Sequence, residues 1–401
     1  MTGNHPARPS TSRPRIGPVD GSWQILAPLS ISGFLLALPG GLMPLWGYHI
    51  RPNFHTAAFY FAVLGVGLAA GAGASLRFRD RWPTERMLAA GSFGAAISLL
   101  MIATAAPPAS IWYQLLAVLA CGMSAGVVNT AVFESLGEVW EGDPAKITLN
   151  ACILFGSGSV YSAWILSRCM ESENPARLLA ITAALPAAAG WLFLRRQLVR
   201  HPRKPLPVAE AVKDLRSVLA ILFALLLFFQ FANEWSIAGW LPVYLIDRLG
   251  FSPESAVALL AMYWLSLTAG RVVAAWLLPR TSHGKMLGVS AFCALFGCVA
   301  LSSADTRGGV VVGVLLIGAG FSAIYPLAAE RIATRFEYYH PGYFNGIFTF
   351  AMLGGILAPF VLGHLAVSEG LRIVPISVMA GSCAVFALVL LVWLGRKVSG
   401  S

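Results

Sequence analysis

Charged residues are scarce in this chain. Lys, Arg, Asp and Glu make up 11% of its 401 residues, against roughly 25% in ordinary soluble domains. Hydrophobic residues account for 57%, and the mean hydropathy is +0.72. This low charge content excludes an ordinary soluble domain. The sequence therefore predicts an integral membrane protein.

Cysteine is also sparse, and the positions of the cysteines indicate no disulfide or metal site. The six cysteines lie in apolar segments and form no CxxC pair. We therefore expect small packing residues, without a disulfide framework, a metal site or a cofactor.

Paired acids and activated nucleophiles, which an enzyme would need, are missing too. The histidines near the apolar segments fall in loops or at segment ends, so an enzyme is not expected. These histidines are His49, His55, His283, His340 and His364.

Long apolar runs dominate what remains. Windows of about 20 residues with few charges recur along the chain, the length that a helix needs to cross a bilayer. The expected spans are 24–47, 56–76, 87–106, 110–135, 148–168, 178–194, 217–246, 254–278, 286–303, 309–330, 343–366 and 373–395. The sequence thus predicts an all-α membrane protein with twelve transmembrane helices.

The net charge of +10 reports membrane topology. Basic residues gather in the tail, in the loop after the second span and in "RRQLVRHPRKPLPVAEAVKDLR" at 195–216. By the positive-inside rule both termini are cytoplasmic, in a multi-pass plasma membrane protein, with a bacterial inner membrane expected. We interpret the basic loops as topology signals that contact lipid head groups, not as a nucleic-acid surface. The polar, Pro-rich first twenty residues predict a disordered tail, not a signal peptide.

The second half of the chain repeats the first. "GLMPLW" at 41–46 aligns with "GWLPVY" at 239–244, and "RWPTERML" at 81–88 aligns with "RTSHGKML" at 280–287. Because six spans separate equivalent points, the two copies share an orientation. The expected organisation is a tail at 1–22, a six-helix bundle at 23–194, a basic linker at 195–216, a second bundle at 217–396 and a tail at 397–401.

This arrangement resembles the major facilitator superfamily of secondary transporters. The segment "LRFRDRWPTERML" retains Asp80, Arg81 and Arg86 of the family's loop after the second helix, but has Leu76 and Pro83 where glycines are usual. The resemblance implies that these three residues form a cytoplasmic gate latch. Glu134, near the cytoplasmic end of its helix, and Arg271, in the eighth span, are expected to pair with opposite charges or to close a gate.

Four short motifs resemble the fucose-permease-like branch of sugar–proton symporters. They are "NEWSIAGWLPVYL", "MYWLSLTAGR", "GFSAIYPLAAERI" and "LGGILAPFVLG", in that order. One departure matters. The branch usually has an acid in its first helix, whereas Leu36 occupies the position that the repeat equates with Glu234. A mechanism with one acid in each half therefore does not apply directly.

Glu234 lies in the middle of a long apolar run, where a carboxylate costs roughly 2.5–3.5 kcal/mol on insertion scales. Helical spacing puts it on one side with other polar and aromatic residues. We expect this face to line a water-filled cavity between the halves; the alternative is a cluster that only joins helices. The expected substrate-binding residues are Gln230, Asn233, Glu234, Trp240, Tyr244, Asn129, Asn150, Tyr263, Tyr325, Asn345 and Trp46.

Proline and glycine occur at matching depths of the first and seventh spans. Proline lacks an N–H and leaves a carbonyl of the preceding turn free. Broken helices at the midplane are typical of transporter binding sites, although a passive kink for packing is an alternative. The expected helix-breaking residues are Pro39, Gly40, Gly41, Pro44, Gly239 and Pro242.

These features predict a secondary active transporter for a small hydroxyl-rich solute, a sugar first, working by alternating access. Aromatic rings can cover the C–H faces of a sugar, and amides can bond its hydroxyls. No span carries a cluster of arginines, which a strongly anionic solute would need. We expect Glu234 to carry the coupled proton, because protonation removes the charge that is costly to bury. The expected partners are solute, proton and lipid, with a monomeric chain. Alternatives are a facilitator, exchanger or exporter of a nucleoside, organic acid or drug-like solute, or a transporter-derived sensor.

Overall fold

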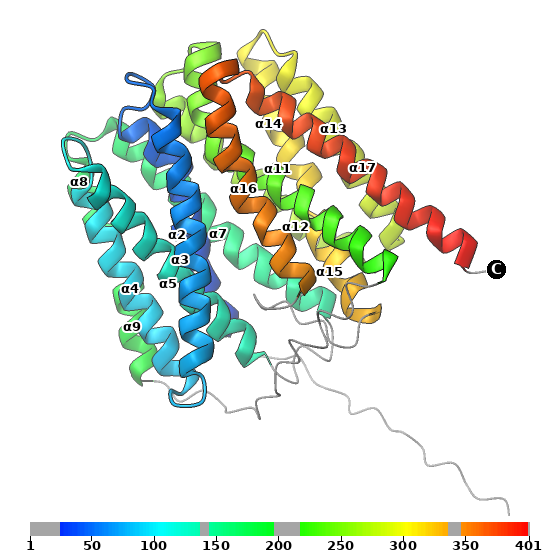
Figure 1. The fold of residues 1–401 in the computed structure, drawn as a ribbon, viewed down its shortest axis with the longest axis horizontal. Coiled ribbons are helices and arrows are strands. Elements are labelled where there is room, and N and C mark those ends of the chain that lie inside the picture. The colour runs from blue at the N-terminus through cyan, green and yellow to red at the C-terminus, as the bar shows by residue number, and fades with distance from the viewer. Residues whose placement is uncertain (1–24, 137–143, 196–216, 336–345, 400–401) are drawn as a thin grey trace, which may run out of the picture.

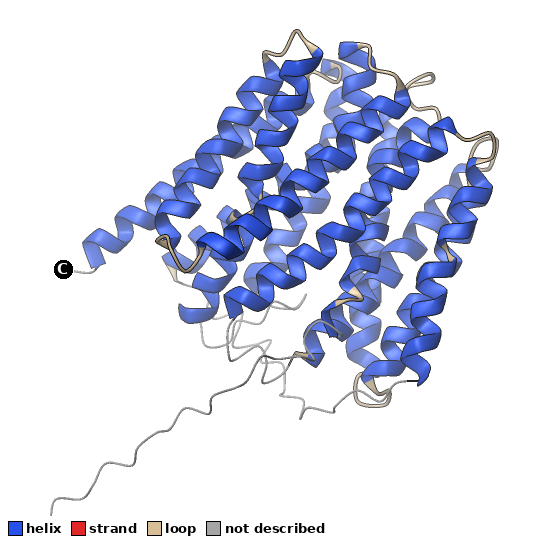
Figure 2. Ribbon diagram, turned by 180° about the vertical axis from the view of Figure 1, so that it is seen from behind, coloured by secondary structure: helices blue, strands red, loops and turns tan. Residues whose placement is uncertain are grey.

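The computed structural model describes residues 25–136, 144–195, 217–335 and 346–399. Across these residues the chain forms helices joined by short loops, with no strand (Figure 2). The helices are α2 (Leu29–Leu45), α3 (Phe54–Phe78), α4 (Thr84–Thr104), α5 (Ile111–Ser135), α7 (Pro144–Glu171), α8 (Pro175–Thr182), α9 (Ala184–Arg195), α11 (Val218–Leu249), α12 (Pro253–Leu277), α13 (His283–Ser302), α14 (Arg307–Phe321), α15 (Ile324–Arg335), α16 (Gly346–Glu369) and α17 (Ile373–Ser399).

The prediction of an all-α protein with twelve spans is confirmed. Eleven segments of the described chain are long and apolar enough to cross a membrane, and α2 is a twelfth, shorter apolar helix. Two of the spans are interrupted: α8 and α9 together form one, and α14 and α15 another. Each expected span coincides with an observed one, because composition alone identifies segments that lipid can surround.

Local sequence signals set the helix ends. Asn53 begins α3 by accepting a hydrogen bond from the Thr56 N–H, and Ser217 begins α11 by accepting one from Ala220. Gly250 ends α11 in the left-handed region, with φ of 63°. Such caps satisfy N–H and carbonyl groups that a helix leaves free at its ends, where lipid offers no partner.

Helix packing follows the internal repeat. In the first half (residues 25–195), α3 packs on α5 and α2 on α7; in the second half (217–399), α12 packs on α14 and α11 on α16. Between the halves, α7 packs on α12 and α16 packs on α3, which are equivalent pairs under the repeat. Figure 1 shows the two halves side by side, with α7 reaching under the second. The seam therefore has approximate two-fold symmetry.

The two halves meet on one side of the membrane. We call the side where α2 begins and α17 ends the terminal side, and the opposite one the distal side. At the distal side Trp240 of α11 packs edge-on against Phe54, with ring centroids 5.9 Å apart, and His55 of α3 packs against His364 of α16 at 4.9 Å. The Ser167 hydroxyl donates to the Glu254 carbonyl at 3.1 Å. These contacts close the seam at its distal end.

The expected helix breaks in the first and seventh spans are wrong. Helix α2 continues through Pro39 and ends just after Pro44, and α11 continues through Pro242. Pro242 has no N–H to donate to the Ala238 carbonyl one turn earlier. This carbonyl faces Gly40 of α2, and a Cβ added to Gly40 would lie 2.0 Å from the carbonyl oxygen. Gly40 thus allows close approach of the halves. Gly41 and Gly239 likewise face neighbouring side chains, Leu166 and Phe61.

Candidate functional site

A cavity lies between the two halves, beside the middle of α11. Its volume is about 90 Å³, smaller than the roughly 300 Å³ of ordinary ligand pockets. The lining residues come from both halves: Leu29, Leu36, Asn129, Phe133, Thr148, Ala151, Cys152, Phe155, Phe231, Glu234, Trp235, Arg271, Tyr325, Phe348 and Met352. Since α2, α7 and α16 contribute residues from their terminal-side parts, the cavity lies on the terminal side of the closed seam.

Glu234 and Arg271 form an ion pair in the cavity wall. The Arg271 Nη2 atom lies 3.3 Å from Glu234 Oε1, and their side chains are 3% and 5% exposed. Arg271 also donates through Nη1 to the Cys152 carbonyl of α7, at 2.9 Å. Because α7 belongs to the first half and α11 and α12 to the second, Arg271 connects the pair to the seam.

Polar atoms at this pair are left without partners. Glu234 Oε2, Arg271 Nε and Gln230 Oε1 are buried and make no hydrogen bond in the described structure. A buried polar atom without a partner costs about 1–3 kcal/mol, so such atoms in or beside a cavity indicate a place for a ligand or water. They offer one N–H donor and two acceptors.

The predicted polar face of α11 does not point to one place. Glu234 enters the cavity, but the Asn233 amide lies 3.4 Å from the Ser382 hydroxyl of α17, and the Gln230 amide donates to the Phe321 carbonyl at 3.4 Å. That carbonyl lies at the interruption between α14 and α15. Because α11 is surrounded by other helices, its polar residues find separate partners around its circumference.

Three of the predicted binding residues line the cavity: Glu234, Asn129 and Tyr325. The other described ones are not among the lining residues. Trp240 donates to the Pro359 carbonyl at the distal seam, Tyr263 donates to the Glu234 backbone carbonyl, and Trp46 packs on Tyr60. Buried Tyr244 and half-buried Asn150 are not among the described lining residues. Asn345 lies outside the described residues.

Sequence reasoning missed part of the wall on α7. Thr148, Ala151, Cys152 and Phe155 all line the cavity, and their spacing of three and four is that of one helix face. The stripe was detectable, but its residues are not distinctive in type. Cys152 was expected to be a packing residue only, and it lies instead beside Arg271.

The gate residues are arranged differently from the expected latch. Asp80, Arg81 and Arg86 are exposed, and the ion-pair partner of Glu134 is Arg79, at 3.1 Å. Arg79 and Glu134 both belong to the first half, and Asp80 lies 3.6 Å from Arg79. In the second half, Glu330 of α15 lies 3.2 Å from His283. A latch between the halves remains a prediction.

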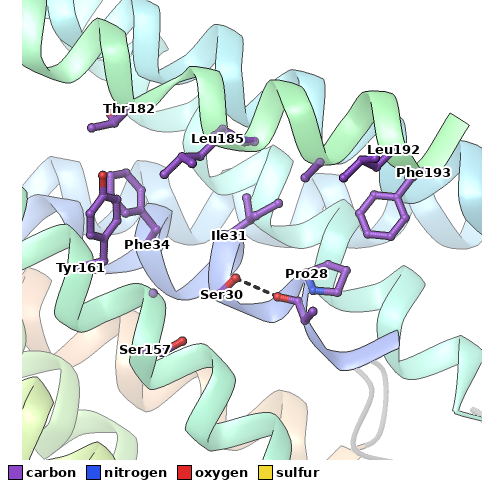
Figure 3. Close-up of a pocket in the computed structure, with 14 residues that line it drawn as sticks. Pro28, Ser30, Ile31, Phe34, Ser157, Tyr161, Thr182, Leu185, Leu192 and Phe193 are labelled. Carbon is purple, nitrogen blue, oxygen red and sulfur yellow. Dashed lines mark hydrogen bonds between the residues drawn. The ribbon is translucent and has the colours of Figure 1, made fainter. Parts of the chain in front are cut away.

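A larger hollow, of about 670 Å³, lies entirely within the first half (Figure 3). Its walls come from α2, α7, α8 and α9. The lining hydroxyls of Ser30, Ser157 and Thr182 each donate to a carbonyl of the turn before them. Among the described residues that line it, Tyr161 has the only ionisable side chain, and none of them belongs to the second half. The hollow therefore does not lie between the two halves.

Comparisons with known proteins agree with this geometry. The family model of the Major Facilitator Superfamily matches residues 175–359. An uncharacterized transporter of Sinorhizobium fredii, y4wD, is 25% identical over 355 residues, which cover 85% of this chain and 91% of that protein. An uncharacterized transporter of the same superfamily type from Yersinia pestis is 22% identical and covers 74% of this chain and 76% of its own length.

Solved structures share the whole fold. The transporter FucP in its outward conformation covers 93% of this chain and 99% of its own, at 15% identity and a TM-score of 0.63. The nucleoside transporter NupG covers 92% and 99%, at 14% identity and a TM-score of 0.71. A D-xylose–proton symporter covers 93% and 97%, at 14% identity and 0.68. The family model covers residues 175–359 and the solved structures share the fold over almost the whole chain, so this chain of apolar helices is similar to the transporters of the major facilitator superfamily.

Proposed function

We propose that the protein is a proton-coupled secondary transporter, which moves a small organic solute through the cavity at Glu234 and Arg271. The observation that supports this most is a buried ion pair in a cavity between two halves that are closed on the distal side. A buried charge in a membrane helix is costly and is typical of a substrate or proton pathway. Rocking of the halves about this site would expose it to each side in turn.

The orientation of the chain is also a proposal. The basic loops support a cytoplasmic terminal side, and with that orientation the distally closed structure is an inward-facing one. A bacterial inner membrane fits this topology. Glu234 would load its proton when the seam opens distally, and release it when the cavity faces the cytoplasm.

Sugar transport has mixed support. FucP, the fucose–proton symporter of E. coli, and the D-xylose–proton symporter share the fold. In this chain, however, two of the amides expected to bind hydroxyls, Gln230 and Asn233, have other partners, and of the described expected amides only Asn129 is among the residues that line the cavity. The solute class is therefore argued separately below.

Glu234→Gln, measured in reconstituted vesicles, tests the coupling. Glutamine keeps the shape of the side chain but cannot carry a proton. We expect accumulation driven by a pH gradient to disappear while exchange of solute across the membrane continues. Accumulation that persists in this variant would exclude Glu234 as the proton carrier. Arg248→Gln, at the exposed distal end of the same helix, is the matched control and should accumulate solute normally.

A further inference from the structure

The ion pair in the cavity restricts what can bind with a proton. Glu234 and Arg271 are almost fully buried, and each is the main neutralising partner of the other. Glu234 is the only acid among the described residues that line the cavity. If Glu234 alone took up a proton, Arg271 would become an unpaired buried cation, which is strongly unfavourable in a low-dielectric site.

Charge balance therefore links the proton to an anion. The empty site holds Glu234 as carboxylate and Arg271 as cation, with no net charge. A site with protonated Glu234, cationic Arg271 and one bound monoanion is also neutral. Loading either the proton or the anion alone leaves one uncompensated charge. A neutral sugar that entered with a proton would leave the same uncompensated cation.

The free atoms of the pair fit a carboxylate. Arg271 uses Nη2 for Glu234 and Nη1 for the Cys152 carbonyl, while its Nε–H is buried without a partner. Arginine binds carboxylates with two parallel N–H···O bonds, so release of Glu234 would free Nη2 beside Nε for this geometry. A phosphate ester carries about −1.5 to −2 at neutral pH, and one arginine with one proton does not balance it.

The rest of the cavity wall fits an apolar body. Its rings and apolar chains include Phe155, Trp235 and Phe348, and Phe231 packs against Tyr325 with ring centroids 5.1 Å apart and the rings tilted by 50°. Asn129 adds one amide. Such walls stabilise a hydrocarbon or aromatic group, not a ring of hydroxyls.

We propose that the transported solute is a small monocarboxylate with an apolar or aromatic body, which replaces Glu234 on Arg271 while Glu234 holds the co-transported proton. This inference rests on the function proposed above. In the loading step a proton forms an O–H bond on the Glu234 carboxylate, and the Glu234–Arg271 contact opens. The solute carboxylate then accepts the Arg271 N–H groups. One proton and one anion cross together, so transport moves no net charge.

The test measures binding and proton uptake on the purified full chain in detergent. The probes are benzoate and phenylacetate, their neutral counterparts benzamide and phenylacetamide, and the neutral solutes fucose, xylose and uridine. We expect the carboxylates to bind in preference to the amides, with about one proton taken from a weakly buffered solution for each molecule bound. Arg271→Gln should weaken carboxylate binding by about 30-fold or more.

Two further variants separate charge from folding. Arg271→Lys keeps the positive charge but loses the paired N–H geometry, so it should fold and bind the carboxylates more weakly than the native chain. Glu234→Gln should bind carboxylate without proton uptake and with little dependence on pH. Arg248→Gln should behave as the native chain.

Several results would overturn the monocarboxylate assignment. The first is that fucose, xylose or uridine binds but no carboxylate does. The second is that Arg271→Gln does not weaken carboxylate binding. The third is that no carboxylate binds although the chain has an intact melting transition. A fucose, xylose or uridine uptake that follows the pH gradient and requires Glu234 would refute this inference and leave the proposed transport function standing.

Discussion

The two halves of the molecule share a fold but differ in their charge. In the second half Glu234 and Arg271 meet in the cavity wall. The repeat equates these positions with Leu36 and Ala72 of the first half, which are both buried and apolar. The chemistry of the site therefore belongs to one half, while the first half contributes mainly the apolar wall and the Cys152 carbonyl.

The halves also differ in how tightly they pack. Helix α17 packs along α11 in the second half, while α2 and α9, the equivalent pair, have no comparable contact and leave the hollow of about 670 Å³ between them. In the second half the middle of the charged helix α11 is buried from Gln230 to Leu245, except at half-buried Trp235. In the first half the hollow borders only the terminal-side part of α2, and the residues of α2 from Ser32 to Pro44 are buried.

Replacing Glu234 and Arg271 by the residues found at the equivalent positions of the first half should have the largest effect on stability and transport. Arg271→Ala alone leaves the Glu234 carboxylate buried without its cation, and we expect a loss of about 3–5 kcal/mol of stability together with loss of transport. Glu234→Leu combined with Arg271→Ala reproduces Leu36 and Ala72. This double variant should recover most of the stability and none of the transport. Thermal unfolding and vesicle uptake measure the two effects, and a double variant that transports would show that the pair is dispensable.

Two glycine substitutions separate contacts within a half from contacts between halves. A Cβ at Gly33 would lie 1.8 Å from the Phe155 carbonyl of the same half, and one at Gly40 would lie 2.0 Å from the Ala238 carbonyl of the other. Gly33→Ala should destabilise the fold by about 1–3 kcal/mol, as overpacking does.

Gly40→Ala should instead disfavour the distally closed state. Each 1.4 kcal/mol of strain changes the balance of states about tenfold, with little loss of melting temperature. Disulfide trapping between cysteines placed at His55 and His364, whose rings pack 4.9 Å apart across the closed seam, measures the closed population. Equal trapping in the native and Gly40→Ala backgrounds would show that this contact does not control closure.

A smaller effect is expected at Trp240. Trp240→Phe keeps the ring packing against Phe54 but removes the N–H that donates to the Pro359 carbonyl, at a cost of about 0.5–1.5 kcal/mol. Trp112→Phe is a control, because Trp112 is 78% exposed. A similar decrease in melting temperature for both variants would contradict a specific role for the buried bond.

The smallest effects should come from two side-chain contacts at the terminal side, the Arg79–Glu134 ion pair and the His283–Glu330 contact. Arg79 and Glu134 are 14% and 10% exposed, whereas His283 and Glu330 are 35% and 20% exposed. Removing Arg79 should cost about 1 kcal/mol, and removing His283 less, because solvent screens the more exposed pair. Thermal unfolding of Arg79→Ala and His283→Ala gives the order, and the reverse order would mean that burial does not determine these energies.

Prediction from sequence succeeded where composition and repetition carry the information. The spans follow from runs such as 218–249, which only lipid or protein can surround, and the equivalence of Glu234 with Leu36 follows from the aligned motifs. It was less successful for side-chain direction. Gln230, Asn233 and Glu234 are neighbours on α11, yet each contacts a different helix, because every side of α11 is in contact with protein. The pairing of Arg271 with Glu234 depends on how α12 packs, and no spacing within one helix reveals it.

Native Cys152 allows the most direct test of the central claim that this cavity opens alternately to the two sides. The measurement is the reaction of a membrane-impermeant thiol reagent with a chain in which Cys152 is the only cysteine, added from either side of oriented vesicles. The account predicts reaction from the terminal side, with a shift toward the distal side when Gly40→Val weakens the distal contact. Reaction from the same side in both backgrounds, or from neither side, would contradict alternating access through this cavity.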